Sequence, residues 1–370
     1  MLTCRWPVYA AHGSVAFNHW LHGELTELAA AVHRRLGANF IALFLGGAYG
    51  CGEGGIAWRK GIETPYHDLD LFLVVHARLG VARLLAPLKQ SWEERLGVGV
   101  EFGRPLLPSE AERLPRRLNF HEFEHGHVLL AGAARVACAR EPERAFMLGG
   151  VRVEGWDANN LLPPIEASRL LVNRGAGLLR AWRICAGLEA LPEPDFIRRR
   201  AYQAILAMGD ALLLSHDRFE PSYRMRGERL PQLLREHQQL ARWGLLPLYG
   251  RALRFKLTPD LVPDLVDLDH VTDLWASIFL HVESRRCGRV FPTVVGYCQD
   301  PHLREPHLSR PWRWPFNVWH NSQVGEWSVV HPRECLYRHL PGLLWHRRTL
   351  DPQWQRESKR LMQLWLRHRS

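Results

Sequence analysis

Residues 66–75, YHDLDLFLVV, constrain the fold more than any other stretch of this 370-residue chain. The apolar run LDLFLVV predicts a buried β-strand, yet it begins beside two carboxylates, Asp68 and Asp70. Side chains two residues apart on a strand point to the same side of a sheet, so both aspartates share one face. The residues on the opposite face, which can enter a core, are Leu69, Leu71, Leu73 and Val75.

Two carboxylates held this close repel each other and raise each other's pKa, and a divalent cation between them removes that cost. Oxygen ligands of this kind suit Mg²⁺ or Mn²⁺, with Mg²⁺ usually shared with substrate phosphates. A third acid, Glu101, lies in VGVEFG at 98–103, which also has the pattern of a strand. If the helix predicted at 81–97 joins these two strands as neighbours, Glu101 flanks the aspartates. Three carboxylates are enough for two metals and an in-line displacement at phosphorus.

A glycine-rich stretch precedes the acidic strand. FIALFLGG at 40–47 predicts a strand that ends in glycines, and residues 51–67 predict a long loop. Glycines let backbone N–H groups approach an anion closely. A strand, a glycine turn and an acidic pair on the next strand together indicate a site for phosphate and metal.

These residues resemble a known superfamily. LGGAYGCGEG followed by PYHDLDLFLVV resembles the nucleotidyltransferase core of the DNA polymerase beta superfamily. The run GG-x-YG-x-GE is most similar to the protein uridylyl- and adenylyltransferases of that superfamily, and the resemblance covers residues 38–132. It implies a Mg²⁺-dependent transfer of a nucleoside monophosphate from a nucleoside triphosphate, such as ATP, to an acceptor hydroxyl, with release of pyrophosphate.

The resemblance also implies roles for individual residues. Asp68, Asp70 and Glu101 correspond to the catalytic metal ligands, with Glu101 also placed to accept the proton of the acceptor. A helical second domain would supply a cation to the triphosphate, for which Arg174 is the first candidate. The nucleotide-binding residues of the glycine loop would be Gly46, Gly47, Tyr49 and Gly50.

Three alternatives remain open. GCGEGG at 50–55 matches a dinucleotide-binding fingerprint, but the residues after it lack the helical pattern that such a fingerprint needs. HEFEH at 121–125 matches a zinc-hydrolase motif, with His121 and His125 as ligands and Glu122 as base. Gly126 would end that helix at once. The third alternative is a nucleotide-binding or regulatory module that has the same fold but is catalytically inactive.

Composition limits the partners only loosely. The net charge of +10 favours a polyanionic ligand, and RPWRWPFNVWHN at 310–321 has the mixture of aromatic and basic residues that suits nucleic-acid bases. The sequence does not distinguish between a protein, an RNA end and a small molecule as the acceptor. Scattered cysteines, and the lack of a signal-peptide or bilayer-spanning pattern, indicate a cytoplasmic protein without a membrane partner.

The coarse pattern predicts three regions. Residues 1–155 form an α/β (α+β) nucleotidyltransferase core with a short mixed sheet, and residues 156–287 form an all-α bundle. Residues 288–370 form a Trp- and Pro-rich extension, irregular over 288–325 and closed by helices near 332–347 and 352–368.

Overall fold

The computed structural model describes residues 7–132, 162–259, 266–323 and 327–368. The chain divides into two compact units. Unit 1 comprises Met1–Pro163, Glu220–Gly227 and Leu253–Pro263, and unit 2 comprises Pro164–Phe219, Glu228–Ala252 and Asp264–Ser370. The boundary predicted at residue 155 lies outside the described residues.

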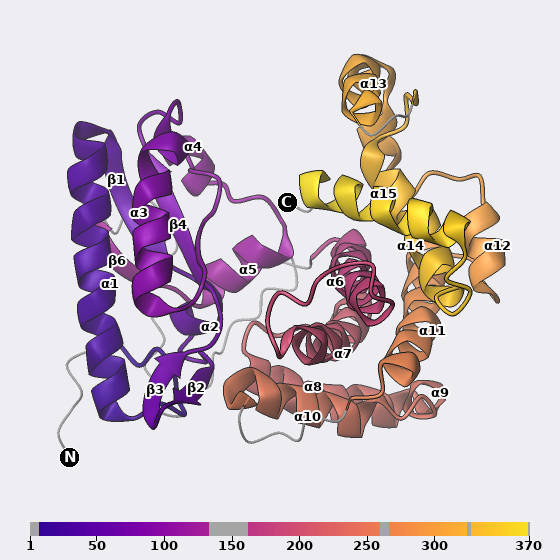
Figure 1. The fold of residues 1–370 in the computed structure, drawn as a ribbon, viewed down its shortest axis with the longest axis horizontal. Helices are drawn as coiled ribbons and strands as arrows, with labels where there is room; N and C mark the ends of the chain where they lie inside the picture. The colour runs from indigo at the N-terminus through magenta and orange to yellow at the C-terminus, as the bar shows by residue number, and fades with distance from the viewer. Residues whose placement is uncertain (1–6, 133–161, 260–265, 324–326, 369–370) are drawn as a thin grey trace. The chain divides into compact units, whose positions relative to one another are not determined.

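Unit 1 is built on a four-stranded mixed sheet of order β5-β4-β1-β6 (Figure 1). Strand β4 pairs with β5 in parallel and with β1 in antiparallel fashion, and β1 pairs with β6 in antiparallel fashion. A parallel pair needs a crossover connection, and helix α3 (Val81–Leu96) supplies it between β4 and β5. The strands are β1 (Phe40–Leu45), β4 (Leu69–Val75), β5 (Val100–Phe102) and β6 (Val128–Gly132).

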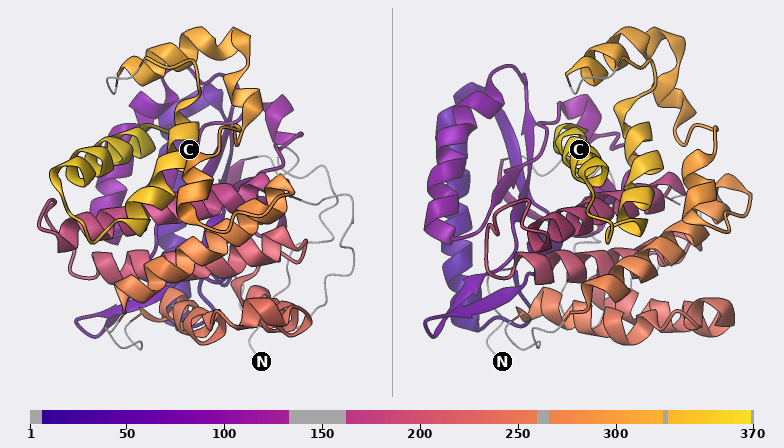
Figure 2. Two further views of the ribbon diagram at one scale, coloured as in Figure 1. Left: turned by 90° about the vertical axis from the view of Figure 1, so that its right-hand side faces the viewer. Right: turned by 45° about the vertical axis from the view of Figure 1, so that its right-hand side comes forward.

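Helices α1 (Val15–Leu36) and α3 cover one face of this sheet, as Figure 2 shows in its right-hand view. Ser14 caps the start of α1 by accepting a hydrogen bond from the N–H of Phe17, and Gly37 ends it. The core beneath the two helices contains the β4 residues predicted to face inward, namely Leu69, Leu71, Leu73 and Val75. The other face packs against α5 (Leu118–His125) through Phe44, Val74 and Phe123.

Two stretches of unit 1 differ from the sequence prediction. Residues 51–67 are not a continuous loop, because they include a hairpin of β2 (Ile56–Arg59) and β3 (Ile62–Pro65). The short helix α2 (Gly47–Gly50) comes directly before them. The hairpin turns at Lys60 and Gly61, whose φ angles of 52° and 79° are the positive values that a two-residue turn requires. The sequence of residues 109–126 predicts a single helix, but the structure has two short helices there, α4 (Pro108–Ala111) and α5.

Unit 2 is helical. Its long helices α6, α7 and α11 pack together, and the Trp275 indole of α11 donates a 3.1 Å hydrogen bond to the Leu171 carbonyl of α6. A Cβ at Gly175 would lie 2.5 Å from the Trp275 ring, so glycine permits this close packing. The helices of the second half of the chain are α6 (Ile165–Cys185), α7 (Phe196–Ser215), α8 (Tyr223–Glu236), α9 (Gln238–Ala241), α10 (Leu245–Leu257), α11 (Leu268–Cys287), α12 (Val294–Gln299), α13 (Trp314–Ser322), α14 (Pro332–Trp345) and α15 (Pro352–His368).

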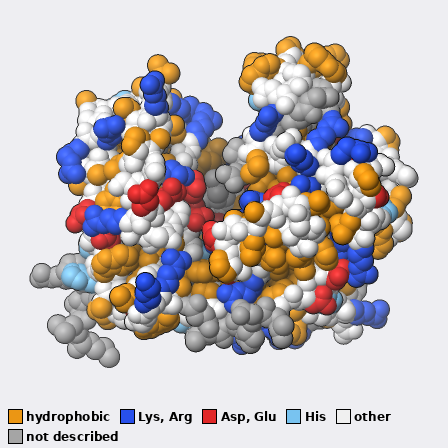
Figure 3. Space-filling model, in the orientation of Figure 1, with side chains coloured by type: hydrophobic (Ala, Val, Ile, Leu, Met, Phe, Trp, Pro, Cys, Tyr) orange, Lys and Arg blue, Asp and Glu red, His pale blue; other side chains and the backbone are white. Residues whose placement is uncertain are grey.

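The C-terminal region confirms the two closing helices and corrects the segment before them. Residues 288–325, predicted to be irregular, include α12 and α13. Helix α13 buries the polar residues Asn317 and Asn321 and leaves large aromatic side chains exposed, and Figure 3 shows hydrophobic side chains gathered over this helix. Its exposed aromatic residues are Trp314, Phe316 and Trp319.

Within the described residues, none of the helices combines the length and the apolar character that crossing a membrane requires. The cysteines recorded there as free thiols are Cys51, Cys185, Cys287, Cys298 and Cys335.

Candidate functional site

The register between β4 and β5 brings two predicted site residues side by side. Asp70 on β4 is the Cα partner of Glu101 on β5. Partner residues on neighbouring parallel strands point to the same face, and Leu69 with its partner Val100 points into the core on the other. The strands are therefore neighbours, as the position of Glu101 required.

Asp68 lies just before β4, against the chain that leads into β5. The N–H of Leu69 donates a 2.8 Å hydrogen bond to the carbonyl of Gly99. A Cβ built on Gly99 would lie 2.7 Å from the Asp68 carboxylate, so the absent side chain leaves room for that carboxylate. Both Asp68 and Glu101 lie close enough for their charges to act on Asp70.

The glycine turn touches the acidic strand directly. The N–H of Gly46 donates a 2.8 Å hydrogen bond to the backbone carbonyl of Asp70. Gly47 has a φ of 59°, and a Cβ on it would lie 2.1 Å from Oδ2 of Asp70. Only glycine satisfies both the backbone conformation and this close approach. The predicted glycine turn is therefore in contact with the predicted metal-ligand carboxylate.

The surroundings of Asp70 disfavour the charged form of its carboxyl group. The pKa of Asp70 is raised from 3.8 to about 6. Burial among protein atoms is the largest cause, Lys256 opposes the rise, and the charges of Asp68, Glu122 and Glu101 add to it. The Asp70 side chain nevertheless remains exposed to solvent. A carboxylate that is accessible and yet disfavoured in its charged form is suited to receiving a cation.

Lys256 was not among the predicted site residues. Its backbone carbonyl lies 2.8 Å from Nε2 of His67, the residue before Asp68, and Phe255 packs edge-on against Tyr66. These contacts anchor the end of α10 beside the start of β4, and its ammonium stands over the ring of Tyr223 at 5.2 Å. Lys256 supplies the largest opposing positive charge on Asp70.

The scarcity of lysine in the sequence could have pointed to Lys256 as a functional candidate. Only four of the 48 basic residues are lysines, and two of them, Lys89 and Lys256, act on the acidic cluster. Nζ of Lys89 on α3 lies 3.0 Å from Oε2 of Glu101. In a chain that otherwise uses arginine, each lysine merits attention as a functional candidate.

Segment Glu220–Gly227 of unit 1 is held against the site by two acids. Glu53, the last residue of the GG-x-YG-x-GE run, accepts hydrogen bonds from Oγ of Ser222 at 2.6 Å and from the N–H of Tyr223 at 2.7 Å. Glu122 on α5 is ion-paired with the buried guanidinium of Arg226. These partners are separated by more than a hundred residues in sequence, and no local motif marks them.

The structure places the other predicted nucleotide-binding residues, Tyr49, Gly50 and Arg174, in three different environments. Tyr49 is fully buried; its hydroxyl donates to the carbonyl of Gly55 at 2.5 Å and accepts from the N–H of Tyr66 at 3.0 Å, so it supports the loop from inside. Gly50 is buried at the end of α2. Arg174 lies half-buried on α6 of unit 2, and its nucleotide role stays a prediction.

The HEFEH residues lie on α5, which ends before Gly126 as the sequence predicted. The pKa of His121 is lowered to about 4, mainly by burial and in smaller part by the charges of His125 and Arg226. Glu122, which the zinc-hydrolase alternative uses as its base, is instead ion-paired with Arg226.

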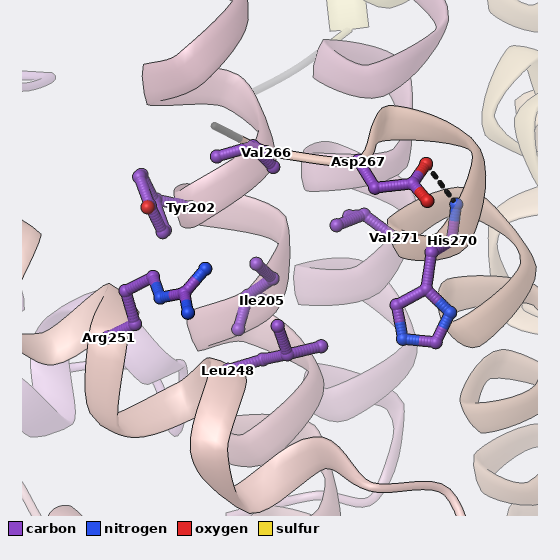
Figure 4. Close-up of a pocket in the computed structure, with 8 residues that line it drawn as sticks. All are labelled: Tyr202, Ile205, Leu248, Arg251, Val266, Asp267, His270 and Val271. Atoms are coloured by element: carbon purple, nitrogen blue, oxygen red, sulfur yellow. Dashed lines mark hydrogen bonds between the residues drawn. The ribbon is translucent and has the colours of Figure 1, made fainter. Parts of the chain in front are cut away.

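Unit 2 contains a cavity of about 400 Å³ with none of the predicted site residues in its lining (Figure 4). Its wall is mainly apolar, and the Asp267 carboxylate is occupied in accepting a 3.0 Å hydrogen bond from the N–H of His270. The lining residues are Tyr202, Ile205, Leu248, Arg251, Val266, Asp267, His270 and Val271.

No family model, no curated protein and no solved structure matches this chain.

Proposed function

We propose that the protein is a Mg²⁺-dependent nucleotidyltransferase that moves a nucleoside monophosphate from a nucleoside triphosphate to an acceptor hydroxyl. The observation that carries the proposal is the convergence of Asp68, Asp70 and Glu101 on one face of the sheet, with side-chain-free Gly47 against the Asp70 carboxylate. The strand pair and the glycine turn come from separate parts of the chain, and both meet at Asp70.

The donor set fits a hard divalent cation. Asp68, Asp70 and Glu101 offer carboxylate oxygens, the ligands that Mg²⁺ and Mn²⁺ prefer. The charges of Asp68 and Glu101 both disfavour the ionised form of Asp70, whereas Lys256 favours it. Such an ion, when bound, neutralises charge on the triphosphate and lowers the pKa of an attacking hydroxyl.

The remaining groups of the site act on charge and orientation. Lys256 places a positive charge beside the aspartates, where it is suited to pairing with a phosphate of the nucleotide. The ion pair with Lys89 orients the Glu101 carboxylate, as a proton acceptor needs to be oriented. With these groups fixed in advance, alignment and charge neutralisation account for most of the expected rate enhancement.

The direct test incubates the full chain with each labelled nucleoside triphosphate and Mg²⁺ or Mn²⁺, and measures pyrophosphate release. We expect release with at least one nucleotide, and its loss in the double variant Asp68→Asn plus Asp70→Asn. The sequence does not identify the natural acceptor, so water or buffer hydroxyls serve as the acceptor in this assay. Slow release of pyrophosphate is then enough to support the proposal.

The outcomes separate the proposal from its alternatives. Nucleotide binding without release of pyrophosphate from any of the four nucleotides contradicts the enzyme and supports a regulatory module. Hydrolysis that needs zinc and is lost on His121→Ala supports the hydrolase instead. The ion pair between Glu122 and Arg226 argues against that last outcome, because it occupies the required base.

Gly47→Ala is expected to reduce pyrophosphate release by about a hundredfold, the cost of displacing a reacting group by about 1 Å. The new Cβ would lie 2.1 Å from Oδ2 of Asp70, so the carboxylate or the turn has to move. Steady-state pyrophosphate assays on the purified variant measure the effect.

Gly61→Ala is the matched control. Gly61 also has a positive φ, 79°, but a Cβ there meets nothing within 4 Å. Both variants therefore carry a similar backbone strain of about 1–2 kcal/mol, and only Gly47→Ala disturbs the site. Equal losses of activity in the two variants would show that strain, and not contact with Asp70, is responsible.

A further inference from the structure

Helix α5 presents a second set of metal-ligand side chains whose chemistry differs from that of the aspartates. His121, Glu124 and His125 each offer one ligand atom, and these atoms all lie within 4.8 Å of one another. Residues at positions i, i+3 and i+4 lie on the same face of a helix, so α5 gathers them by its own geometry. We propose that this face of α5 binds Zn²⁺ or a transition metal with the same preference for imidazole.

The orientation of His125 prepares one ligand atom. Its Nδ1 lies 2.8 Å from the backbone carbonyl of His121. A carbonyl oxygen only accepts hydrogen bonds, so Nδ1 carries the proton and the lone pair of the neutral ring resides on Nε2. A hydrogen bond of this kind behind a histidine ligand fixes its tautomer and raises its basicity. The two imidazole rings lie 4.4 Å apart between centroids.

The three side chains form a gradient of exposure. His121 is buried, His125 is half-buried and Glu124 is exposed. One ligand is thus fixed by the packing of the protein, and the ion has access from solvent through the other two. Two histidines and one carboxylate leave the fourth position of a tetrahedral zinc ion for water or another small ligand.

The two sites differ in the ions they prefer. Imidazole nitrogens favour zinc and its neighbours in the first transition series, whereas the Asp68 and Asp70 carboxylates favour Mg²⁺ or Mn²⁺. They are nonetheless connected, because α5 also carries Phe123, whose ring stacks on Phe72 of β4 at 4.2 Å. An ion on α5 would restrain the helix that packs beside the acidic strand.

The test is a zinc titration of the metal-free full chain, in excess Mg²⁺ and without nucleotide, with a chromophoric chelator as competitor. We expect one zinc ion per chain, and an affinity at least about a hundredfold lower in His125→Ala and about tenfold lower in Glu124→Gln. Cobalt substitution gives an independent readout, since the visible absorption of Co²⁺ reports tetrahedral nitrogen and oxygen ligands.

His127→Ala is the matched control. His127 also bonds a backbone carbonyl through Nδ1, that of Phe123 at 2.8 Å, but it does not belong to the cluster. Unchanged zinc affinity in folded His125→Ala and Glu124→Gln proteins overturns the proposal, as does an equal loss in His127→Ala. Loss of the zinc on Asp70→Asn would assign the ion to the aspartates and also overturn it. Zinc binding is measured without nucleotide, so its failure leaves the proposal of nucleotidyl transfer untouched.

Discussion

Asp70→Asn is expected to reduce nucleotidyl transfer by at least about a thousandfold and, at neutral pH, to make the metal-free protein more stable. The activity is expected to fall because Asp70 is a proposed metal ligand, and a metal ion held there would contribute several kcal/mol to stabilising the transition state. The stability rises because the Asp70 charge is disfavoured by burial and by its acidic neighbours. A residue that only supports the fold would show a loss of both properties.

The pH dependence of this gain follows from the pKa of Asp70, which is raised from 3.8 to about 6 in the folded protein. Below pH 4 the carboxyl is protonated in both the folded and the unfolded states, so the charge costs nothing. Between pH 4 and 6 the unfolded chain ionises first, and above pH 6 the full penalty is present. The variant should therefore exceed the wild type in stability at pH 7 and match it near pH 3.5.

The size of the gain is limited by solvent. Full burial would make this pKa rise worth about 3 kcal/mol, but Asp70 is exposed, so we expect about 1 kcal/mol and an increase in melting temperature of about 2–4 °C. Thermal unfolding in the presence of a chelator measures it.

Asp269→Asn is the contrasting control. Although burial alone would raise its pKa, Arg347 and Arg348 hold the pKa of Asp269 below its ordinary value, so this variant should lose stability. A fall in melting temperature for Asp70→Asn at pH 7, similar to that of Asp269→Asn, would refute the electrostatic account of the site.

Glu283→Gln is expected to destabilise the protein by about 3–5 kcal/mol, the cost of leaving a buried charge without its partner. Glu283 on α11 is fully buried. Its carboxylate accepts two hydrogen bonds from Arg286, at 2.8 and 2.7 Å, one from Tyr297 at 2.7 Å, and one from Ser168 on α6. Glutamine keeps the shape of the side chain but removes the charge that balances Arg286. Thermal unfolding should show a melting temperature lower by about 6–15 °C.

Glu236→Gln provides the surface comparison, because Glu236 pairs with Arg218 at 3.3 Å and both side chains are about half exposed. Its effect should stay below about 1 kcal/mol. Burial would raise the pKa of Glu283, but Arg286 and the hydroxyl donors hold it below the ordinary 4.5. The stabilisation is therefore fully present above pH 4.5 and is lost as the pH falls through the lower folded value. Equal effects of the two variants at pH 7 would contradict the role assigned to the buried network.

The sequence determined the parts of the site that depend on local pattern. Alternation along 66–75 predicted which side chains of β4 enter the core, because a strand has a period of two residues. The succession of strand, helix and strand over 69–103 allowed the two strands to be neighbours, with Glu101 beside the aspartates. The parallel pairing itself, and the register that pairs Asp70 with Glu101, came from the structure.

Tertiary structure alone decided which distant groups act on the aspartates. Lys256 is brought to Asp70, and Arg226 to Glu122, by contacts that span more than a hundred residues, and neither helical nor strand periodicity encodes such contacts. The hairpin at 56–65 was missed for a related reason, since its short strands are defined by pairing with each other and by a turn at Lys60 and Gly61. Local patterns fix the face on which a side chain lies. Its charged neighbours depend on how the whole chain packs, because electrostatic interactions act through space and not along the sequence.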